Sequence, residues 1–294
     1  MASSPHRERI DAFLDHSRSF EGLRYVYPVV SRRSGGLSIG VNLNPDKRCN
    51  FDCVYCQVDR TIPAQVMHVD LEILAEELRA LMSRVQDGRI WLHPRLAQTP
   101  AHLRRLNDIA FSGDGEPTTE KRFPEAVQLA VDLLKECELE EVTPVLITDA
   151  ACLHHDRVRR GLDVMHASRG IIWAKLDAGT APFYEVVNRS HVPFRRVLAN
   201  LALAVSSYRV VVQSLFFRAE DTPPSAEELQ AYCERLVEIE AEGPIEEVHI
   251  YTIARRPAEP WCTPLRDAEV DALVAQVSHH VRAPVRGFYG PPEL

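Results

Sequence analysis

The feature that most constrains the fold is a regular alternation of two kinds of segment along the 294 residues. Six short apolar runs are typical of strands, and an amphipathic helical pattern follows each of them. The expected strands span residues 37–43, 108–113, 143–148, 171–176, 209–217 and 245–253. The expected helices span residues 69–85, 123–137, 155–165, 193–206, 225–241 and 266–281. Continuous apolar strands joined by helices predict an α/β fold with a parallel sheet covered by helices.

The β-α units predict one domain with short extensions. An arm and extension is expected over residues 1–36, the sheet domain over 37–282 with an insertion at about 86–107, and a tail over 283–294. The units can form an incomplete barrel or an open doubly wound sheet, and the pattern leaves both arrangements open. In either one, ligands gather at the C-terminal ends of the strands.

Helix caps are also expected at two of the helices. Asp70 stands at the start of the first expected helix and suits its N-cap. Ser225, with Glu228 three residues later, predicts a capping box at the start of another.

The composition indicates in which cellular compartment the protein works and which classes of binding partner it favours. The formal net charge is −8 and no Lys/Arg-rich run is present, so a broad nucleic-acid surface is not favoured. The seven cysteines are too dispersed for the disulfide framework of a small secreted domain. The polar N-terminus lacks a signal-peptide pattern, and no apolar run of about 18 residues predicts a membrane span. These observations predict a cytoplasmic protein.

Three cysteines follow the first expected strand. Cys49, Cys53 and Cys56 have C-x3-C-x2-C spacing, and Tyr55 precedes the last of them. A structural zinc site takes four protein ligands, and a simple electron-transfer iron–sulfur cluster takes four cysteines. Three cysteines therefore indicate a cluster with one iron open to a small molecule. Zinc, with His68 or an acidic residue as the fourth ligand, is the alternative.

A glycine-rich loop follows the second expected strand, with the sequence S-G-D-G-E-P-T-T over residues 112–119. Glycines on either side of Asp114 allow the backbone to approach a ligand closely, and Pro117 biases Glu116 towards an extended conformation. Taken alone, the segment is equally consistent with a tight turn. Its place after the neighbouring strand predicts that it lies beside the cysteine loop.

Together, the cysteine spacing and the G-x-G-E-P segment resemble the radical S-adenosylmethionine superfamily. Further likeness points to the iron–sulfur oxidoreductase group related to the tRNA wyosine-synthesis enzymes. It is carried by residues 30–33, 49–61, 112–119, 175–178 and 255–257. The resemblance implies a partial (β/α)6 barrel of parallel strands with outer helices.

The resemblance also implies a cofactor pair. Cys49, Cys53 and Cys56 would bind one 4Fe–4S cluster, whose open iron is chelated by S-adenosylmethionine. Reductive cleavage would give a 5′-deoxyadenosyl radical that abstracts hydrogen from an organic substrate, with electrons from a flavodoxin- or ferredoxin-type donor. The residues expected to contact S-adenosylmethionine are Tyr55, Gly113, Asp114, Gly115, Glu116, Thr148, Asp149, Lys175 and Ile253.

The substrate is less constrained than the cofactors. Candidate catalytic residues are Asp177 and Cys262, and candidate substrate ligands are Arg32, Arg33, Gln213 and Arg218. The first 48 residues contain no cysteine, so the second N-terminal cluster of the wyosine enzymes is not expected. A small metabolite or a peptide is therefore favoured over tRNA. A non-catalytic metal-binding module is the alternative from a different class.

Overall fold

The computed structural model of this protein describes residues 18–61, 63, 64 and 66–290. In spatial order, its main sheet contains β1 (Val26–Ser31), β2 (Gly36–Val41), β3 (Leu106–Phe111), β4 (Thr143–Thr148), β5 (Ile171–Lys175), β6 (Val210–Leu215), β8 (Glu247–Tyr251) and β10 (Val285–Phe288). The edge strand β1 pairs antiparallel with β2, and all other neighbours are parallel. A separate antiparallel pair contains β7 (Phe217–Ala219) and β9 (Cys262–Pro264).

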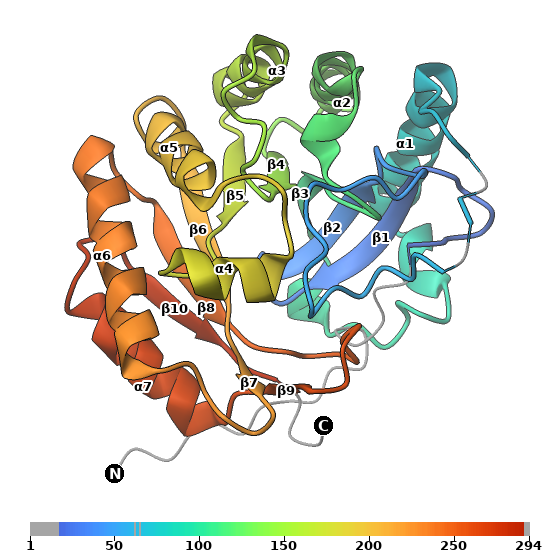
Figure 1. Ribbon diagram of the computed structural model, residues 1–294. Helices are drawn as coiled ribbons and strands as arrows, with labels where there is room; N and C mark the ends of the chain where they lie inside the picture. The colour runs from blue at the N-terminus through green and yellow to red at the C-terminus, as the bar shows by residue number, and fades with distance from the viewer. Residues whose placement is uncertain (1–17, 62, 65, 291–294) are drawn as a thin grey trace.

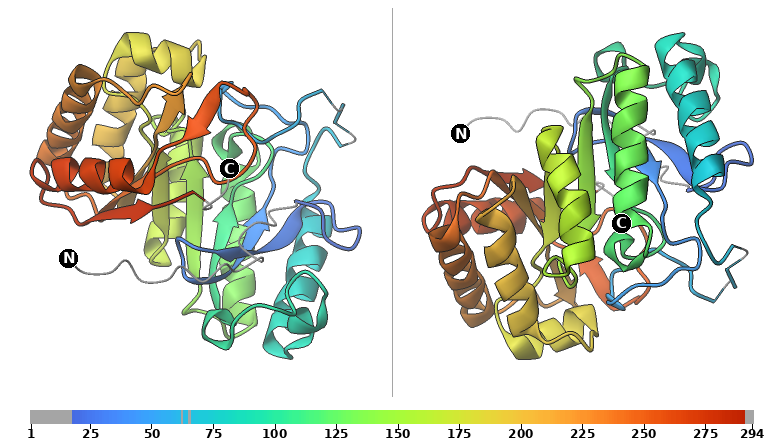
Figure 2. Two further views of the ribbon diagram at one scale, coloured as in Figure 1. Left: turned by 90° about the horizontal axis from the view of Figure 1, so that it is seen from below. Right: turned by 90° about the horizontal axis from the view of Figure 1, so that it is seen from above.

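The helices lie outside the curled sheet. They are α1 (Leu71–Gln86), α2 (Phe123–Glu136), α3 (Asp156–Ala167), α4 (Ala181–Asn188), α5 (Phe194–Val205), α6 (Ala226–Glu242) and α7 (Asp267–Ser278). All except α4 form an arc around the convex side of the sheet (Figure 1). From above, helices stand in front of the strands, whereas from below the strands are in view (Figure 2). This confirms the expected partial barrel with outer helices.

The sheet is larger than the six parallel strands that the sequence predicts. Those six correspond to β2, β3, β4, β5, β6 and β8, while β1 and β10 extend the sheet at its two edges. Pro28 interrupts β1 and is tolerated there because an edge strand does not need every backbone donor. The four residues of β10 are too few for a clear periodic pattern. No helix among the described residues is long and apolar enough to cross a membrane.

The two predicted helix caps have different outcomes. The carboxylate of Asp70 accepts hydrogen bonds from two backbone N–H groups in the first turn of α1, at 2.9 and 3.3 Å, which confirms this cap. Ser225 caps α6, but the expected capping box is wrong. The carboxylate of Glu228 instead accepts hydrogen bonds from the N–H of Gly179, at 2.5 Å, and the hydroxyl of Thr180, at 2.6 Å. The carboxylate of Glu228 therefore binds donors in the loop after β5 and not the backbone N–H of Ser225, as a capping box would require.

The concave face of the sheet differs from the convex face. A small apolar cluster of Ala110, Val145, Trp173 and Val211 lies apart from the main core. Polar side chains share the alternating strand positions on this side, because successive residues of a strand point to opposite faces. Lys175 is paired with Gln213, which is paired in turn with His249 on β8. The interior of the half-barrel is therefore partly polar, as a binding pocket requires.

Candidate functional site

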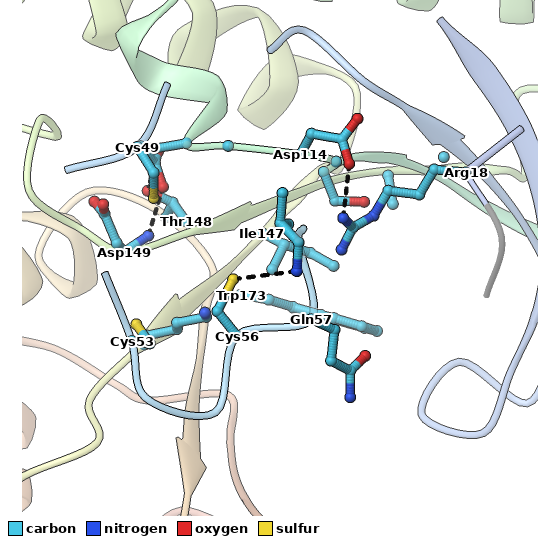
Figure 3. A pocket seen from close by; sticks show the side chains of 18 of the residues that line it. Arg18, Cys49, Cys53, Cys56, Gln57, Asp114, Ile147, Thr148, Asp149 and Trp173 are labelled. Carbon is cyan, nitrogen blue, oxygen red and sulfur yellow. Dashed lines mark hydrogen bonds and ion pairs between the residues drawn. The ribbon is translucent and has the colours of Figure 1, made fainter. Parts of the chain in front are cut away.

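The cysteine loop lies between β2 and α1, at the C-terminal end of the strand. Two backbone hydrogen bonds of 3.0 Å join it to the last turn of α4. Cys53 is buried, Cys56 is half-buried and Cys49 is exposed. Figure 3 shows the three cysteine side chains along one side of a pocket. The fold thus presents all three thiols at the end of the barrel where parallel α/β folds bind ligands.

This pocket has a volume of about 520 Å³, within the range of small-molecule sites. It collects most of the residues that the sequence singles out. Those lining it are Cys49, Cys53, Tyr55, Cys56, Gly113, Asp114, Gly115, Glu116, Thr148, Asp149, Lys175, Arg33 and Gln213. They come from the turn between β1 and β2, from β5 and β6, and from the loops after β2, β3 and β4.

The loop after β3 packs directly on the cysteine loop, and Gly115 allows this contact. A Cβ atom at this position would lie 1.8 Å from the carbonyl oxygen of Arg48, which no other residue could accommodate without a shift. The same carbonyl accepts a 3.0 Å hydrogen bond from the N–H of Glu116. The two motifs are therefore joined through their backbones.

The carboxylate of Glu116 is buried and connects the loops after β3 and β4. One oxygen accepts hydrogen bonds from the N–H and hydroxyl of Thr118, at 3.1 and 2.5 Å, and from the hydroxyl of Thr148, at 2.7 Å. The other accepts the N–H of Asp149 at 2.7 Å. Both oxygens are thus engaged within the protein, and they fix the position of Asp149. The expected contact between Glu116 and S-adenosylmethionine stays a prediction.

Asp149 offers a free acceptor to the pocket. Its Oδ1 accepts a 2.8 Å hydrogen bond from the N–H of Ala151, while its buried Oδ2 has no hydrogen-bond partner among the described residues. Burial, followed by repulsion from Glu116, raises the pKa of Asp149. A buried acceptor without a donor is costly. A ligand hydroxyl, such as one on a ribose, would supply the missing donor.

Asp114 is held on both sides, and Figure 3 shows its ion pair with Arg18. Arg18 donates to Oδ1 at 2.8 Å, and the side-chain amide of Asn42 donates to Oδ2 at 2.7 Å. The carbonyl oxygen of that amide accepts the N–H of Asp114 at 3.1 Å. The carboxylate therefore has a fixed orientation at the rim of the pocket, set by residues before and after the first hairpin.

Asp177 is buried outside the pocket lining. Its carboxylate accepts hydrogen bonds from the hydroxyl of Tyr55, from Nδ2 of Asn188 at 3.1 Å and from the N–H of Leu215 at 2.9 Å. The ring of Tyr55 lies under the ammonium of Lys175, 5.4 Å from the ring centroid. The observed contacts of Asp177 hold the cysteine loop in place, and its catalytic role stays a prediction.

Four other expected site residues also lie outside the pocket lining. Ile253 is buried, and Cys262 is buried on β9. Arg32 donates to the carbonyl oxygen of Tyr289 at 2.8 Å, and Arg218 forms a salt bridge with Glu269. The described contacts of these side chains are therefore made within the protein rather than across the pocket.

The structure adds pocket residues that the sequence reasoning missed. They are Arg18, Tyr27, Asp108, Trp173, Tyr251 and Arg255. Asp108 carried a usable signal, because a carboxylate inside an otherwise apolar strand is unusual. Arg255 lies in a segment that carries the family likeness, but that likeness did not assign it to the site, and Arg18 carried no signal because it comes from an irregular segment.

Asp108 has an unusual setting on the concave face. The hydroxyl of Ser38 donates to Oδ1, while the buried Oδ2 has no hydrogen-bond partner among the described residues. Burial raises the pKa of Asp108 from 3.8 to about 6. Between these two values the folded protein binds a proton that the unfolded chain has released. The free energy of unfolding should therefore fall as the pH rises through this window.

We expect an Asp108→Asn variant to lack this fall, because asparagine does not ionise. For the wild type, the fall in unfolding free energy amounts to about 3 kcal/mol. The difference in unfolding free energy between the variant and the wild type should therefore shift in favour of the variant by up to that much from pH 4 to pH 8. Urea unfolding at both pH values measures the difference. Asp132→Asn, on the exposed face of α2, is the control and should change stability by less than about 0.5 kcal/mol. An equal effect of Asp108→Asn at both pH values would contradict the expectation.

The cysteines fit a cluster better than a single ion. Among the described residues, no three or more His, Cys, Asp or Glu side chains are arranged to hold one metal ion. This gives no support to the zinc alternative. A 4Fe–4S cluster makes a different demand, because each thiolate binds its own iron and the sulfurs surround a larger volume. Three cysteine side chains along one end of a pocket suit that demand.

The sequence has distant curated relatives, and no protein-family model matches it. It is 26% identical to the UPF0026 protein MJ1312 of Methanocaldococcus jannaschii over 164 residues, 56% of this chain and 43% of that protein. It is 26% identical to a UPF0026 protein of Helicobacter pylori over 195 residues, 66% of this chain and 54% of that protein. A Brachyspira hyodysenteriae protein named GTPase Obg is 23% identical over 258 residues, 84% of this chain and 32% of that protein. The chain thus spans about a third to about half of each relative's length.

Solved structures share the fold at low identity. Streptococcus suis SuiB bound to S-adenosylmethionine matches with a TM-score of 0.57 and 10% identity, over 87% of this chain and 52% of that one. TYW1 with a lysine–pyruvate adduct matches with a TM-score of 0.54 and 14% identity, over 92% of this chain and 80% of that one. Because the likeness extends over most of this chain, its fold is the partial barrel that these two structures share.

Proposed function

We propose that this chain is a radical S-adenosylmethionine enzyme that acts on an organic substrate held inside the half-barrel. The observation that carries the proposal is the meeting of the cysteine loop and the loops after β3 and β4 at one pocket. Three thiols, an unsatisfied carboxylate oxygen on Asp149 and a basic group on Lys175 face the same space.

Each part of this lining has a task. Cys49, Cys53 and Cys56 would hold the 4Fe–4S cluster, with S-adenosylmethionine bound beside it in the same pocket. When bound, the cluster and S-adenosylmethionine together supply a 5′-deoxyadenosyl radical for hydrogen abstraction. An external one-electron donor of flavodoxin or ferredoxin type provides the reducing equivalent. The protein contributes position and exclusion of water, and the cofactors contribute the reactive chemistry.

The polar groups orient S-adenosylmethionine. Asp149 accepts hydrogen bonds from the ribose hydroxyls through its free Oδ2, and Thr148 is its neighbour on the same loop. Gly113 and Gly115 line the pocket beside the cysteine loop, where their lack of a side chain leaves room for the methionine end of S-adenosylmethionine. Trp173 and Tyr251 provide apolar walls on the concave face, where a reactive species needs protection from solvent.

The proposal is tested by anaerobic reconstitution of the protein with iron and sulfide. We expect about four irons per chain, and 5′-deoxyadenosine after addition of dithionite and S-adenosylmethionine. Chromatography of the quenched reaction measures the product. Bound zinc without iron or sulfide, and no binding of S-adenosylmethionine, would favour a non-catalytic metal-binding module instead.

The favoured substrate is a small metabolite or a peptide, because the formal net charge of −8 opposes a general affinity for nucleic acid. A tRNA substrate is the second candidate. It is favoured by the likeness to TYW1 over 92% of this chain. A gel shift with unfractionated tRNA at two salt concentrations distinguishes the candidates. Non-specific electrostatic binding weakens strongly as salt rises, so a complex that persists at the higher salt favours tRNA.

A further inference from the structure

Three arginine side chains, Arg18, Arg33 and Arg255, line the pocket that the cysteines share. They come from the segment before β1, the turn between β1 and β2, and the loop after β8. Arg18 is neutralised by its salt bridge with Asp114 at 2.8 Å. Neither Arg33 nor Arg255 forms a salt bridge with any described residue. Two of these three arginines thus face the pocket without a salt bridge to a described acid.

Arg33 is held in place by neutral groups. Its Nη1 donates a 2.5 Å hydrogen bond to Oε1 of Gln213. Its guanidinium lies 5.2 Å from the ring centroids of both Trp173 and Tyr251. Aromatic faces attract a cation without neutralising its charge. Arg33 is therefore fixed in orientation and remains positively charged inside the half-barrel.

Arg255 has fewer partners still. Its Nε and Nη1 atoms are buried and have no hydrogen-bond partner among the described residues. Burial, followed by repulsion from Arg32, Arg33 and Arg18, lowers the pKa of Arg255 to about 10. Buried donor atoms without acceptors on a half-buried cation beside like charges are costly, and an arriving anion would offset that cost.

Arg255 belongs to the loop after β8, whereas most groups assigned to S-adenosylmethionine lie on the cysteine loop and around the ends of β3 and β4. The charges that act on it most strongly come from Arg18, Arg32, Arg33 and Tyr27, in and around the first hairpin. None belongs to the cysteine loop or to the loops after β3 and β4. Because β8 lies near the far end of the sheet from β1, Arg255 reaches across the open side of the half-barrel.

We propose that Arg255, with Arg33 beside it, binds an anionic group of the substrate, either a carboxylate or a phosphate. The planar guanidinium presents paired donors that match the oxygens of both groups. The inference rests on the proposed function in one respect, that the molecule carrying the anion is the substrate of the radical reaction. The anion-binding site itself can be measured without any turnover.

Calorimetric titration of the reconstituted protein with inorganic phosphate or acetate, at constant ionic strength, tests the proposal. Arg255→Ala should weaken binding of the preferred anion by about tenfold or more, because hydrogen bonds to a charged partner are lost. Arg255→Lys should keep part of the affinity. Arg256→Ala is the matched control, since this neighbouring arginine is exposed and does not line the pocket, and it should bind as the wild type does.

Preference for phosphate would identify a phosphorylated substrate, and preference for acetate would identify a carboxylic acid. Saturating S-adenosylmethionine should leave the anion affinity of the wild type unchanged. Displacement of the anion by S-adenosylmethionine would overturn the proposal, because Arg255 would then serve the cofactor. Equal affinities in the wild type and a folded Arg255→Ala variant would overturn it as well. Anion binding without any 5′-deoxyadenosine formation would count against the proposed function alone.

Discussion

A Cys53→Ala variant is expected to lose the iron–sulfur cluster and all reductive cleavage of S-adenosylmethionine. Cys53 is the buried member of the cysteine motif, 6% exposed at the base of its loop. With three cysteines and an exchangeable ligand at the fourth iron, the cluster has no spare protein ligand. Loss of one thiolate leaves two irons without protein coordination, so we expect both iron content and 5′-deoxyadenosine formation to fall to background.

The matched control is Cys137→Ala. Cys137 is a half-buried thiol at the C-terminal end of α2, outside the pocket lining. It should retain the iron and sulfide content of the wild type. Far-UV circular dichroism shows whether each variant is folded, since alanine in place of Cys53 removes a buried sulfur but leaves the backbone contacts of the loop. Wild-type iron content and product formation in a folded Cys53→Ala variant would exclude Cys53 as a cluster ligand.

A Glu116→Gln variant is expected to bind S-adenosylmethionine about tenfold to a hundredfold more weakly than the wild type. The amide can keep its oxygen towards Thr118 and Thr148, where three donors converge. Its nitrogen then faces the N–H of Asp149, which in the wild type donates to the second carboxylate oxygen at 2.7 Å. Two opposed donors push the loop after β4 outwards and displace the free oxygen of Asp149.

Equilibrium binding of S-adenosylmethionine to the reconstituted variant measures this effect. Iron content should be unchanged, because the hydrogen bond that joins Glu116 to the cysteine loop comes from its backbone N–H, which glutamine keeps. Glu120→Gln is the control, as this half-buried glutamate accepts a hydrogen bond from the N–H of Arg122 at the surface. Unchanged affinity in Glu116→Gln would show that the bridge between the loops does not position the cofactor.

Much of the barrel could be predicted from local sequence patterns. Each parallel strand and its helix carries its own periodicity, because both faces of such a strand are buried and each helix needs one apolar face. The edge strand β1 and the short β10 lack that signal, as does the two-turn helix α4. Their conformation depends on pairing with β2, on pairing with β8, and on packing against the cysteine loop.

The sequence by itself determined the chemical components: three cysteines, a glycine-rich acidic loop and the β-α order that brings both to one edge of a sheet. Only the tertiary structure decided which polar residues share the pocket. It joined Arg33 and Arg255, 222 positions apart in the numbering, on the open side of the half-barrel. It also placed Asp177 outside the pocket lining, where its carboxylate accepts a hydrogen bond from the hydroxyl of Tyr55. The physical reason is that local periodicity assigns a side chain to a face of its strand or helix. The curvature of the whole sheet decides which of those faces enclose a common space.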